Sequence, residues 1–215
     1  RTKAYMLPDT ARDAKGRHVA NLLAFQPDEQ IAGVLTVKDY EQASYLVLAT
    51  KHGLVKKTKL TEYDTNRTGG LIAINLRDGD ELVSARLVDK GGQLIMVSDK
   101  GMSVRFSADE LRPMGRATSG VIGMKFRGSD QLLAMDVVRP DCDLVTVTDE
   151  GFAKRTPLDD WNTKGRGGIG VVAMKIVEER GSLVAALVCE SDDSIFAIAS
   201  NGVVIRTPVA DIRQT

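Results

Sequence analysis

The sequence predicts an all-β protein of the β-propeller class, built from four-stranded blades of about 50 residues each. Three observations predict this class: glycines recur at a fixed spacing, a cation follows each of them, and each period holds four short apolar runs. Four short strands per unit suit a blade, because radial packing leaves only short, protected sheet edges. A β-solenoid is the structural alternative, although its repeats are usually shorter.

A β-hairpin is predicted in each unit, because two strand-like runs are joined by a short turn that contains glycine. In one unit the runs are 144–148 and 152–156, and Gly151 ends the turn between them. The turn glycine recurs at separations of 48, 50 and 51 residues. These hairpin glycines are Gly53, Gly101, Gly151 and Gly202.

Two further runs follow each hairpin. A second series of glycines, Gly70, Gly120 and Gly170, opens runs such as VIGMKF, and a run such as LLAMDVV closes each unit. Runs that are apolar throughout, such as YLVLAT and IFAIAS, are expected to be the innermost strands. One helical turn per unit is predicted at Leu60/Tyr63, Leu111/Met114, Leu158/Trp161 and Val209/Ile212, with Trp161 in the core.

The repeat favours one continuous array, so residues 1–215 are expected to form a single domain. Complete repeats are expected at about 45–89, 94–139 and 144–189, with incomplete repeats at both ends. A hydrophobic content of 43% with 27% charged residues is ordinary for a globular protein. The longest apolar runs are about seven residues, too short to cross a membrane, and the two cysteines show no metal-binding spacing.

The charge is neutral in total but uneven along the repeat. There are 29 basic and 29 acidic residues. The segments from each hairpin glycine to the next glycine of the second series, with the corresponding terminal stretches, hold 18 basic and 9 acidic residues, whereas the remaining segments hold 11 and 20. Equivalent positions of stacked repeats lie on one edge, so a basic rim on a neutral body is predicted.

The candidate binding residues are cations at recurring positions. A cation stands four residues after every hairpin glycine, and solvated strand positions accept Glu, Gln or Ser as readily. The glycine-rich stretch 165–170 lacks the GK[ST] of a P-loop, which favours a turn, and its flanking cations are candidates for phosphate contact. The rim candidates are Arg1, Lys57, Arg105, Arg155 and Arg206, the loop candidates are Arg67, Arg116, Lys164 and Arg166, and Lys56 and Lys154 are secondary.

A catalytic centre is not predicted. The sequence holds no Ser/His/Asp or Cys/His signature, and His18 and His52 have no partner pattern. Neither a cofactor nor a metal ion is expected in this domain.

The motifs LVKKTKL, LRPMGRATSGVIGMKF and GFAKRTPL, with the repeated glycine and cation pattern, resemble the C-terminal domain of DNA gyrase A of the actinobacterial kind. The resemblance covers the whole chain, and LRPMGRATSGV is its most specific part. The corresponding domain of topoisomerase IV remains an alternative. One motif differs: the QRRGGKG box of the family would precede Arg1, and Gly165 to Gly170 matches it only partly.

The resemblance implies a β-pinwheel, usually of six blades, whose neighbours exchange a segment. It also implies a non-catalytic cytoplasmic, nucleoid-associated domain that bends duplex DNA around a basic rim, beside the rest of gyrase A and its partner protein, gyrase B. The catalytic tyrosine of the family belongs to preceding domains. From the residues alone, a propeller that binds an acidic protein and a propeller enzyme remain alternatives.

Overall fold

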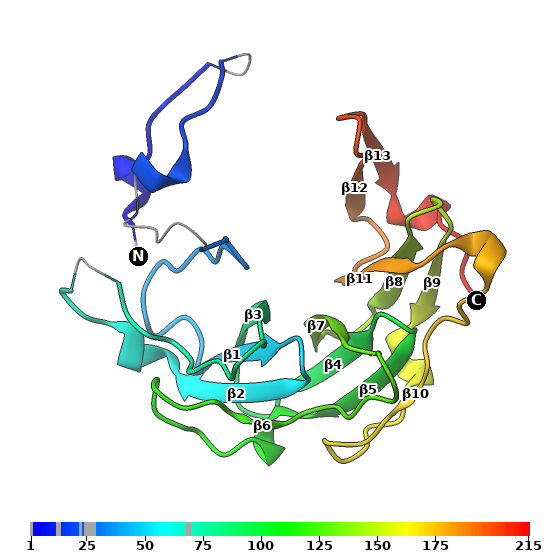
Figure 1. Cartoon of the computed structure of the whole chain (residues 1–215), viewed down its shortest axis with the longest axis horizontal. Coiled ribbons are helices and arrows are strands. Elements are labelled where there is room, and N and C mark those ends of the chain that lie inside the picture. The colour runs from blue at the N-terminus through cyan, green and yellow to red at the C-terminus, as the bar shows by residue number, and fades with distance from the viewer. Residues whose placement is uncertain (1, 12–13, 22, 24–28, 68–69) are drawn as a thin grey trace.

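The protein is described by a computed structural model that covers residues 2–11, 14–21, 23, 29–67 and 70–215. The described chain contains β-strands and short 3₁₀ turns and no α-helix. The sheets follow one another around an open arc, and the N-terminal segment and the last hairpin flank its gap (Figure 1). This arrangement confirms the predicted all-β propeller class.

Three units contain a hairpin followed by an inner strand, and each hairpin is followed by a 3₁₀ turn. The first repeat comprises β1 (Tyr45–Thr50), β2 (Leu54–Lys59), η3 (Leu60–Tyr63) and β3 (Leu82–Val88). The second comprises β4 (Gln93–Ser98), β5 (Met102–Ser107), η4 (Ala108–Glu110), β6 (Val121–Ile122) and β7 (Leu132–Val138). The third comprises β8 (Asp143–Thr148), β9 (Ala153–Pro157), η5 (Leu158–Asp160), β10 (Val171–Val172), η6 (Glu178–Arg180) and β11 (Leu183–Cys189). The terminal elements are η1 (Ala4–Met6), η2 (Val19–Asn21), β12 (Ser194–Ile198), β13 (Val204–Pro208) and η7 (Val209–Asp211).

Neighbouring repeats exchange a strand. The sheet orders are β3-β1-β2-β6 and β10-β5-β4-β7, so β6 of the second repeat completes the first sheet and β10 of the third completes the second. The third sheet is β11-β8-β9, and the last hairpin is β12-β13. The exchanged strands lie at the outer edge of the arc, and β3 and β7 lie at its inner edge (Figure 1). Each sheet that contains an exchanged strand is therefore assembled from two repeats.

The prediction that YLVLAT is an innermost strand is wrong. This run is β1, which pairs with β3 on one side and β2 on the other. Its apolar character reflects a central place in the sheet, where both faces and both edges are covered. The inner edge is formed by β3, whose residues are largely half-buried.

The core lies between repeats rather than inside each one. Val47 of the first repeat shares a buried cluster with Phe106 and Met124 of the second. Ile95 of the second shares another with Trp161 of the third, which confirms the core position of Trp161. Three of the four predicted helical turns are confirmed as 3₁₀ turns, η3, η5 and η7. The turn predicted at Leu111/Met114 is wrong, because η4 begins three residues earlier, at Ala108, and Leu111 is therefore the counterpart of Trp161.

The described residues include no helix long and apolar enough to span a bilayer. Cys142 and Cys189 are free and buried, and burial raises the pKa of the Cys189 thiol to about 11. That thiol is therefore protonated at neutral pH and a poor nucleophile.

Two hairpin glycines, Gly53 and Gly101, provide the contact at which the exchanged segment docks. The Gly53 carbonyl accepts a hydrogen bond of 2.8 Å from Gly123 N–H, and the Gly101 carbonyl accepts one of 2.8 Å from Ala173 N–H. Gly101 has a φ of +79°, and a Cβ there would lie 2.0 Å from the Met174 carbonyl oxygen. Glycine is therefore required at this position both by the backbone conformation and by the next repeat.

A pair of alanine substitutions separates these two requirements. Gly151 has nearly the same φ, +80°, but a Cβ there would meet nothing within 4 Å. We expect Gly151→Ala to cost about 1 kcal/mol of unfolding free energy through φ alone, and Gly101→Ala to cost at least about twice as much. Urea unfolding followed by circular dichroism measures both, and equal losses would contradict the proposed role of the inter-repeat contact.

Candidate nucleic-acid interface

The cation four residues after a hairpin glycine lies at the joint between two repeats in three of the four hairpins. The Lys57 ammonium donates a hydrogen bond of 2.7 Å to the carbonyl of Ala108, in the 3₁₀ turn of the next repeat. The Arg105 guanidinium donates bonds of 2.7 and 3.2 Å to the carbonyls of Leu158 and Trp161 in the same way. We call these inter-repeat contacts the clasps.

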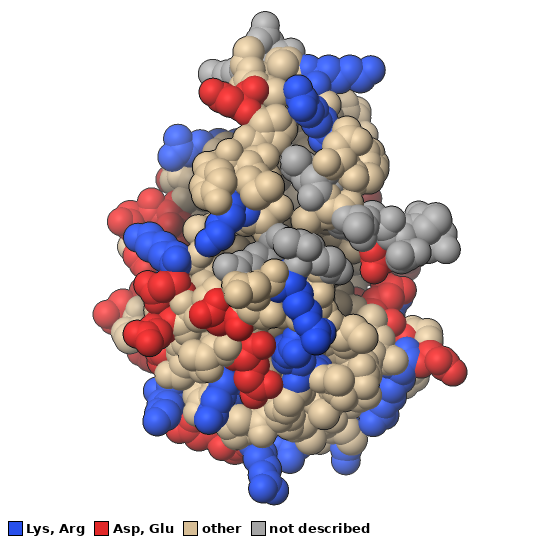
Figure 2. Space-filling model, turned by 90° about the vertical axis from the view of Figure 1, so that its left-hand side faces the viewer, with Lys and Arg blue, Asp and Glu red and all other residues tan. Residues whose placement is uncertain are grey.

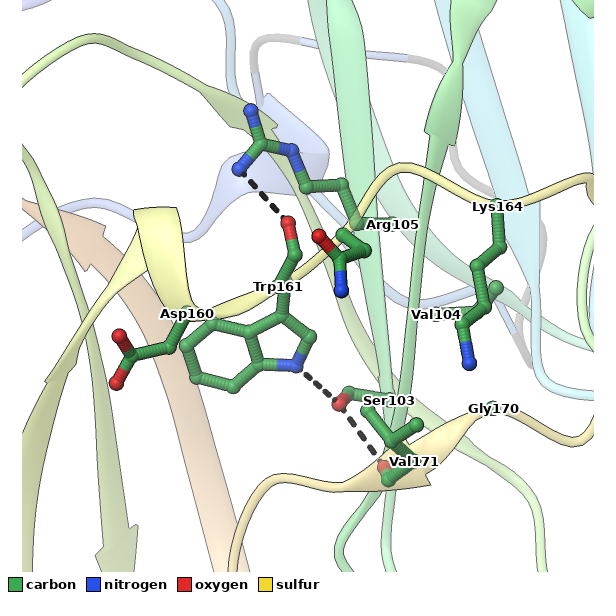
Figure 3. Close-up of a pocket in the computed structure, with 9 residues that line it drawn as sticks. Ser103, Val104, Arg105, Asp160, Trp161, Lys164, Gly170 and Val171 are labelled. Atoms are coloured by element: carbon green, nitrogen blue, oxygen red, sulfur yellow. Dashed lines mark hydrogen bonds between the residues drawn. The ribbon is translucent and has the colours of Figure 1, made fainter.

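The third clasp also joins a hairpin cation to the 3₁₀ turn of the next repeat. Arg155 Nε donates a hydrogen bond of 2.9 Å to the Ile212 carbonyl, which ends the 3₁₀ turn η7. A cation is favourable there because the carbonyls at the end of a helical turn carry partial negative charge and need donors. Figure 3 shows the Arg105 clasp, in which Trp161 also donates its indole N–H to Ser103 Oγ at 2.8 Å.

Each clasp cation has a second partner in its own hairpin, at the residue twelve positions before it. For Lys57 this is the Tyr45 ring, whose centroid lies 4.6 Å from Nζ. For Arg105 it is Gln93 Oε1, which accepts a bond of 2.6 Å from Nε. For Arg155 it is Asp143, in an ion pair of 2.6 Å. The partner thus differs between repeats, although each cation also reaches the 3₁₀ turn of the next repeat.

These contacts correct the predicted rim. Lys57 is only 3% exposed and Lys56 is fully buried, so neither presents its charge to a ligand at the surface. Arg105 and Arg155 are half-buried, and their guanidinium groups are engaged by carbonyls and by Gln93 or Asp143. Arg206 is exposed, and Arg1 lies outside the described residues. The spacing identified a real repeated position, but most of its cations bind the neighbouring repeat.

Lys56 holds a loop of the second repeat against the first. Its ammonium donates hydrogen bonds to the carbonyls of Ala73, at 2.6 Å, and Arg116. Burial lowers the pKa of Lys56 from 10.5 to about 8, with Glu62 opposing the shift and Arg116 adding to it. Burial also lowers the pKa of Lys154, the equivalent residue of the third repeat, which is half-buried.

The glycine-rich stretch 165–170 is a turn, and its backbone is used by the preceding repeat. Gly167 N–H donates to the Gly123 carbonyl at 2.6 Å, and the Gly168 carbonyl accepts a bond of 2.9 Å from Lys125 N–H. The N–H groups of Arg166, which donates to Glu110, and of Gly167 are therefore engaged within the protein, and the turn predicted from the sequence is confirmed. Contact between this loop and a phosphate would therefore involve the side chains of Lys164 and Arg166.

Three stretches of the outer edge are rich in cations and nearly free of acids. We call residues 64–77, 112–127 and 162–177 the rim segments. They hold nine Lys or Arg residues and one acidic residue, Asp64. Eight of the nine cations are exposed, and Arg116 is half-buried. The nine are Arg67, Arg77, Arg112, Arg116, Lys125, Arg127, Lys164, Arg166 and Lys175.

Two of the rim segments, 112–127 and 162–177, follow the outside of the arc, because the exchanged strands β6 and β10 lie within them. Figure 2 shows Lys and Arg side chains projecting along the lower edge of one face, with Asp and Glu more frequent above them. Four of the predicted loop candidates, Arg67, Arg116, Lys164 and Arg166, belong to this set. Sequence reasoning missed the other five, although the absence of acids from 112–127 and 162–177 was a readable signal.

Comparison with known proteins gives the same periodicity. The family model described as "DNA gyrase C-terminal domain, beta-propeller" matches residues 1–38, 44–89, 92–139, 143–190 and 193–215. The chain belongs to the DNA gyrase C-terminal domain family. Each matched segment after the first begins at or near the first strand of a hairpin in the structure.

Relatives in this family include the DNA gyrase A protein of Streptomyces coelicolor, 59% identical over the whole chain, and that of Mycobacterium tuberculosis, 52% identical. The chain spans 26% of the length of each. The crystal structure of the C-terminal domain of DNA topoisomerase IV matches with a TM-score of 0.87 and 27% identity, over 98% of this chain and 66% of that one. A DNA gyrase A C-terminal domain matches with a TM-score of 0.84 and 27% identity, over 94% and 68%.

The clasp can be tested against an equivalent cation that lies exposed. Arg105→Met removes two hydrogen bonds to backbone carbonyls of the next repeat, and we expect it to lower the unfolding free energy by about 2–3 kcal/mol. Arg206 stands at the same position of the last hairpin, so we expect Arg206→Met to change it by less than about 0.5 kcal/mol. Urea unfolding of both variants measures the difference, and similar losses would mean that the clasp does not stabilise the joint.

Proposed function

We propose that this domain is a non-catalytic DNA-binding module, and that duplex DNA lies along the rim segments and bends around the arc. The observation that supports this most directly is the row of exposed cations on the outer edge, recurring with the repeat and almost free of acids. Lys and Arg side chains contact phosphates, which carry no sequence information, so the binding is expected to be largely non-specific.

The convex shape supports bending. Bending 20–30 base pairs by 40–90° costs on the order of 1–6 kcal/mol, so the contacts have to be numerous and spread along the duplex. The rim segments satisfy this need, because they bring cations from three successive repeats to one edge. Wrapping of DNA by histones relies on the same combination of backbone contacts and DNA deformability.

In the whole protein, we infer that this domain serves gyrase A and acts beside its remaining domains and the gyrase B protein. The names of the curated relatives and their identity of 52–59% support gyrase over topoisomerase IV. On this proposal the wrapped duplex would be delivered to a catalytic core that lies outside the present sequence, which leads to negative supercoiling.

The salt dependence of duplex binding tests the proposal. Log affinity is expected to fall linearly with log salt concentration, at a slope of about −0.9 for each phosphate neutralised. Replacing Lys164 and Arg166 with Gln should make the slope less steep by about 0.9 for each phosphate that is no longer neutralised. Urea unfolding checks that the variant stays folded without the bond from Arg166 to the Ile122 carbonyl. Fluorescence anisotropy of a labelled duplex at several salt concentrations measures affinity and slope together.

A charge-matched control uses exposed cations outside the rim segments. Lys90 and Arg139 occupy equivalent connections after β3 and β7, and both are exposed. Replacing both with Gln removes the same charge, and the slope should stay close to that of the unmodified chain. A slope that falls equally for the two double variants would mean that DNA responds to net charge and does not occupy the rim segments.

A further inference from the structure

An exposed aliphatic side chain recurs once per repeat within the rim segments. It stands two residues after each glycine of the second series, at Ile72, Ile122 and Val172, with a separation of 50 residues each time. These side chains are 67%, 43% and 61% exposed. Single exposed apolar residues are ordinary on protein surfaces, but recurrence at one position of the repeat on a strongly charged edge is not explained in that way.

Packing does not account for these residues. In β6, Val121 packs against the core cluster of the first two repeats, whereas Ile122 belongs to the opposite face of the strand and is exposed. Strand formation alone would be served by Thr, which has a similar β propensity and does not expose as much apolar surface. The position instead holds Ile, Ile and Val.

The Ile122 side chain lies beside an arginine loop of the following repeat, and the backbone next to Ile72 is tied to the corresponding loop. Arg166 donates a hydrogen bond of 2.8 Å from its guanidinium to the Ile122 carbonyl. A Cβ on Gly167 would lie 3.8 Å from Ile122 Cγ2, so the loop passes the isoleucine closely. In the preceding joint, the Lys56 ammonium ties the carbonyl of Ala73, the residue after Ile72, to that of Arg116.

We propose that Ile72, Ile122 and Val172 contact the minor groove of the bound duplex, against the deoxyribose rings and base edges. This inference rests on the proposed function, and it adds an apolar component to an interface of cations. Proteins that bend DNA through the minor groove combine arginines with aliphatic side chains, which press on or between base steps. Where a duplex bends toward the protein, the minor groove on the inner side narrows, so its deoxyribose walls come closer to these side chains and apolar contact favours the bent duplex.

The apolar component can be separated from the electrostatic one by its response to salt. In the triple variant Ile72→Thr, Ile122→Thr and Val172→Thr, every charge is retained. We expect duplex affinity to fall at least about tenfold at constant salt, while the slope of log affinity against log salt stays the same. Energy transfer between dyes at the two duplex ends should show less bending at equal occupancy.

Competition with netropsin, which occupies the minor groove, locates the apolar side chains on the duplex. Netropsin should weaken binding of the unmodified chain but have less effect on the triple variant, which no longer reaches into the groove. The matched control replaces exposed aliphatic residues outside the rim segments with Thr, at Val184, Ile198 and Ile205, and should bind DNA as the unmodified chain does. Circular dichroism checks that all variants keep their fold.

The outcomes distinguish this inference from the proposal on which it rests. An unmodified chain that shows no salt-dependent duplex binding would overturn both. An unmodified chain that binds, beside a triple variant that binds and bends DNA equally well, would overturn the groove contact alone and point to a protein partner for these side chains. A loss of affinity accompanied by a less steep salt slope would also overturn it, because fewer phosphates would then be neutralised.

Discussion

The structure depends on hydrogen bonds from a cation in one repeat to the 3₁₀-turn carbonyls of the next. A single repeat cannot bury its apolar faces, and the core clusters accordingly lie between repeats. Hydrophobic packing alone tolerates sliding, whereas a guanidinium bound to Leu158 and Trp161 fixes one orientation. Each such bond to a charged group contributes about 1.5–3 kcal/mol. The clasps therefore set the angle between neighbouring repeats and also strengthen the contact between them.

The clasps also determine which charges remain for a ligand. A buried ammonium or guanidinium requires partners, and Lys57 and Arg155 find theirs in carbonyls and in Tyr45 or Asp143. Their positive charge is consequently withheld from the surface, although it contributes to the basic excess that the sequence displays. The accessible excess lies later in each repeat, where 112–127 and 162–177 contain no acidic residue. A neutral chain thus gains a basic edge because the acids are nearly excluded from three segments.

The period, the hairpins and the strand class could be predicted from the sequence, because turn glycines and apolar runs are local signals. The role of the recurring cation could not, because Lys and Arg are equally suited to a phosphate and to a carbonyl. Each clasp cation is held in part by the residue twelve positions before it in the sequence. These partners, Tyr45, Gln93 and Asp143, share no chemical type, so they form no pattern that the sequence alone reveals. The place of β1 in the middle of its sheet also escaped prediction, since it depends on an inner strand more than 30 residues away.

Strand exchange connects the joint to the rim. Two of the rim segments begin in loops that follow the 3₁₀ turns η4 and η5 and continue into β6 and β10, which belong to the sheet of the preceding repeat. The Lys56 ammonium, in β2, also connects two rim segments, because it donates hydrogen bonds to the carbonyls of Ala73 in one and Arg116 in the next. The position of a rim cation therefore depends on two repeats. Its distance from the equivalent cation of the next repeat follows from the angle that the clasps set between repeats. A partner that binds along this edge has to follow the curvature of the arc. A bound duplex would therefore bend, whereas the protein would keep its shape.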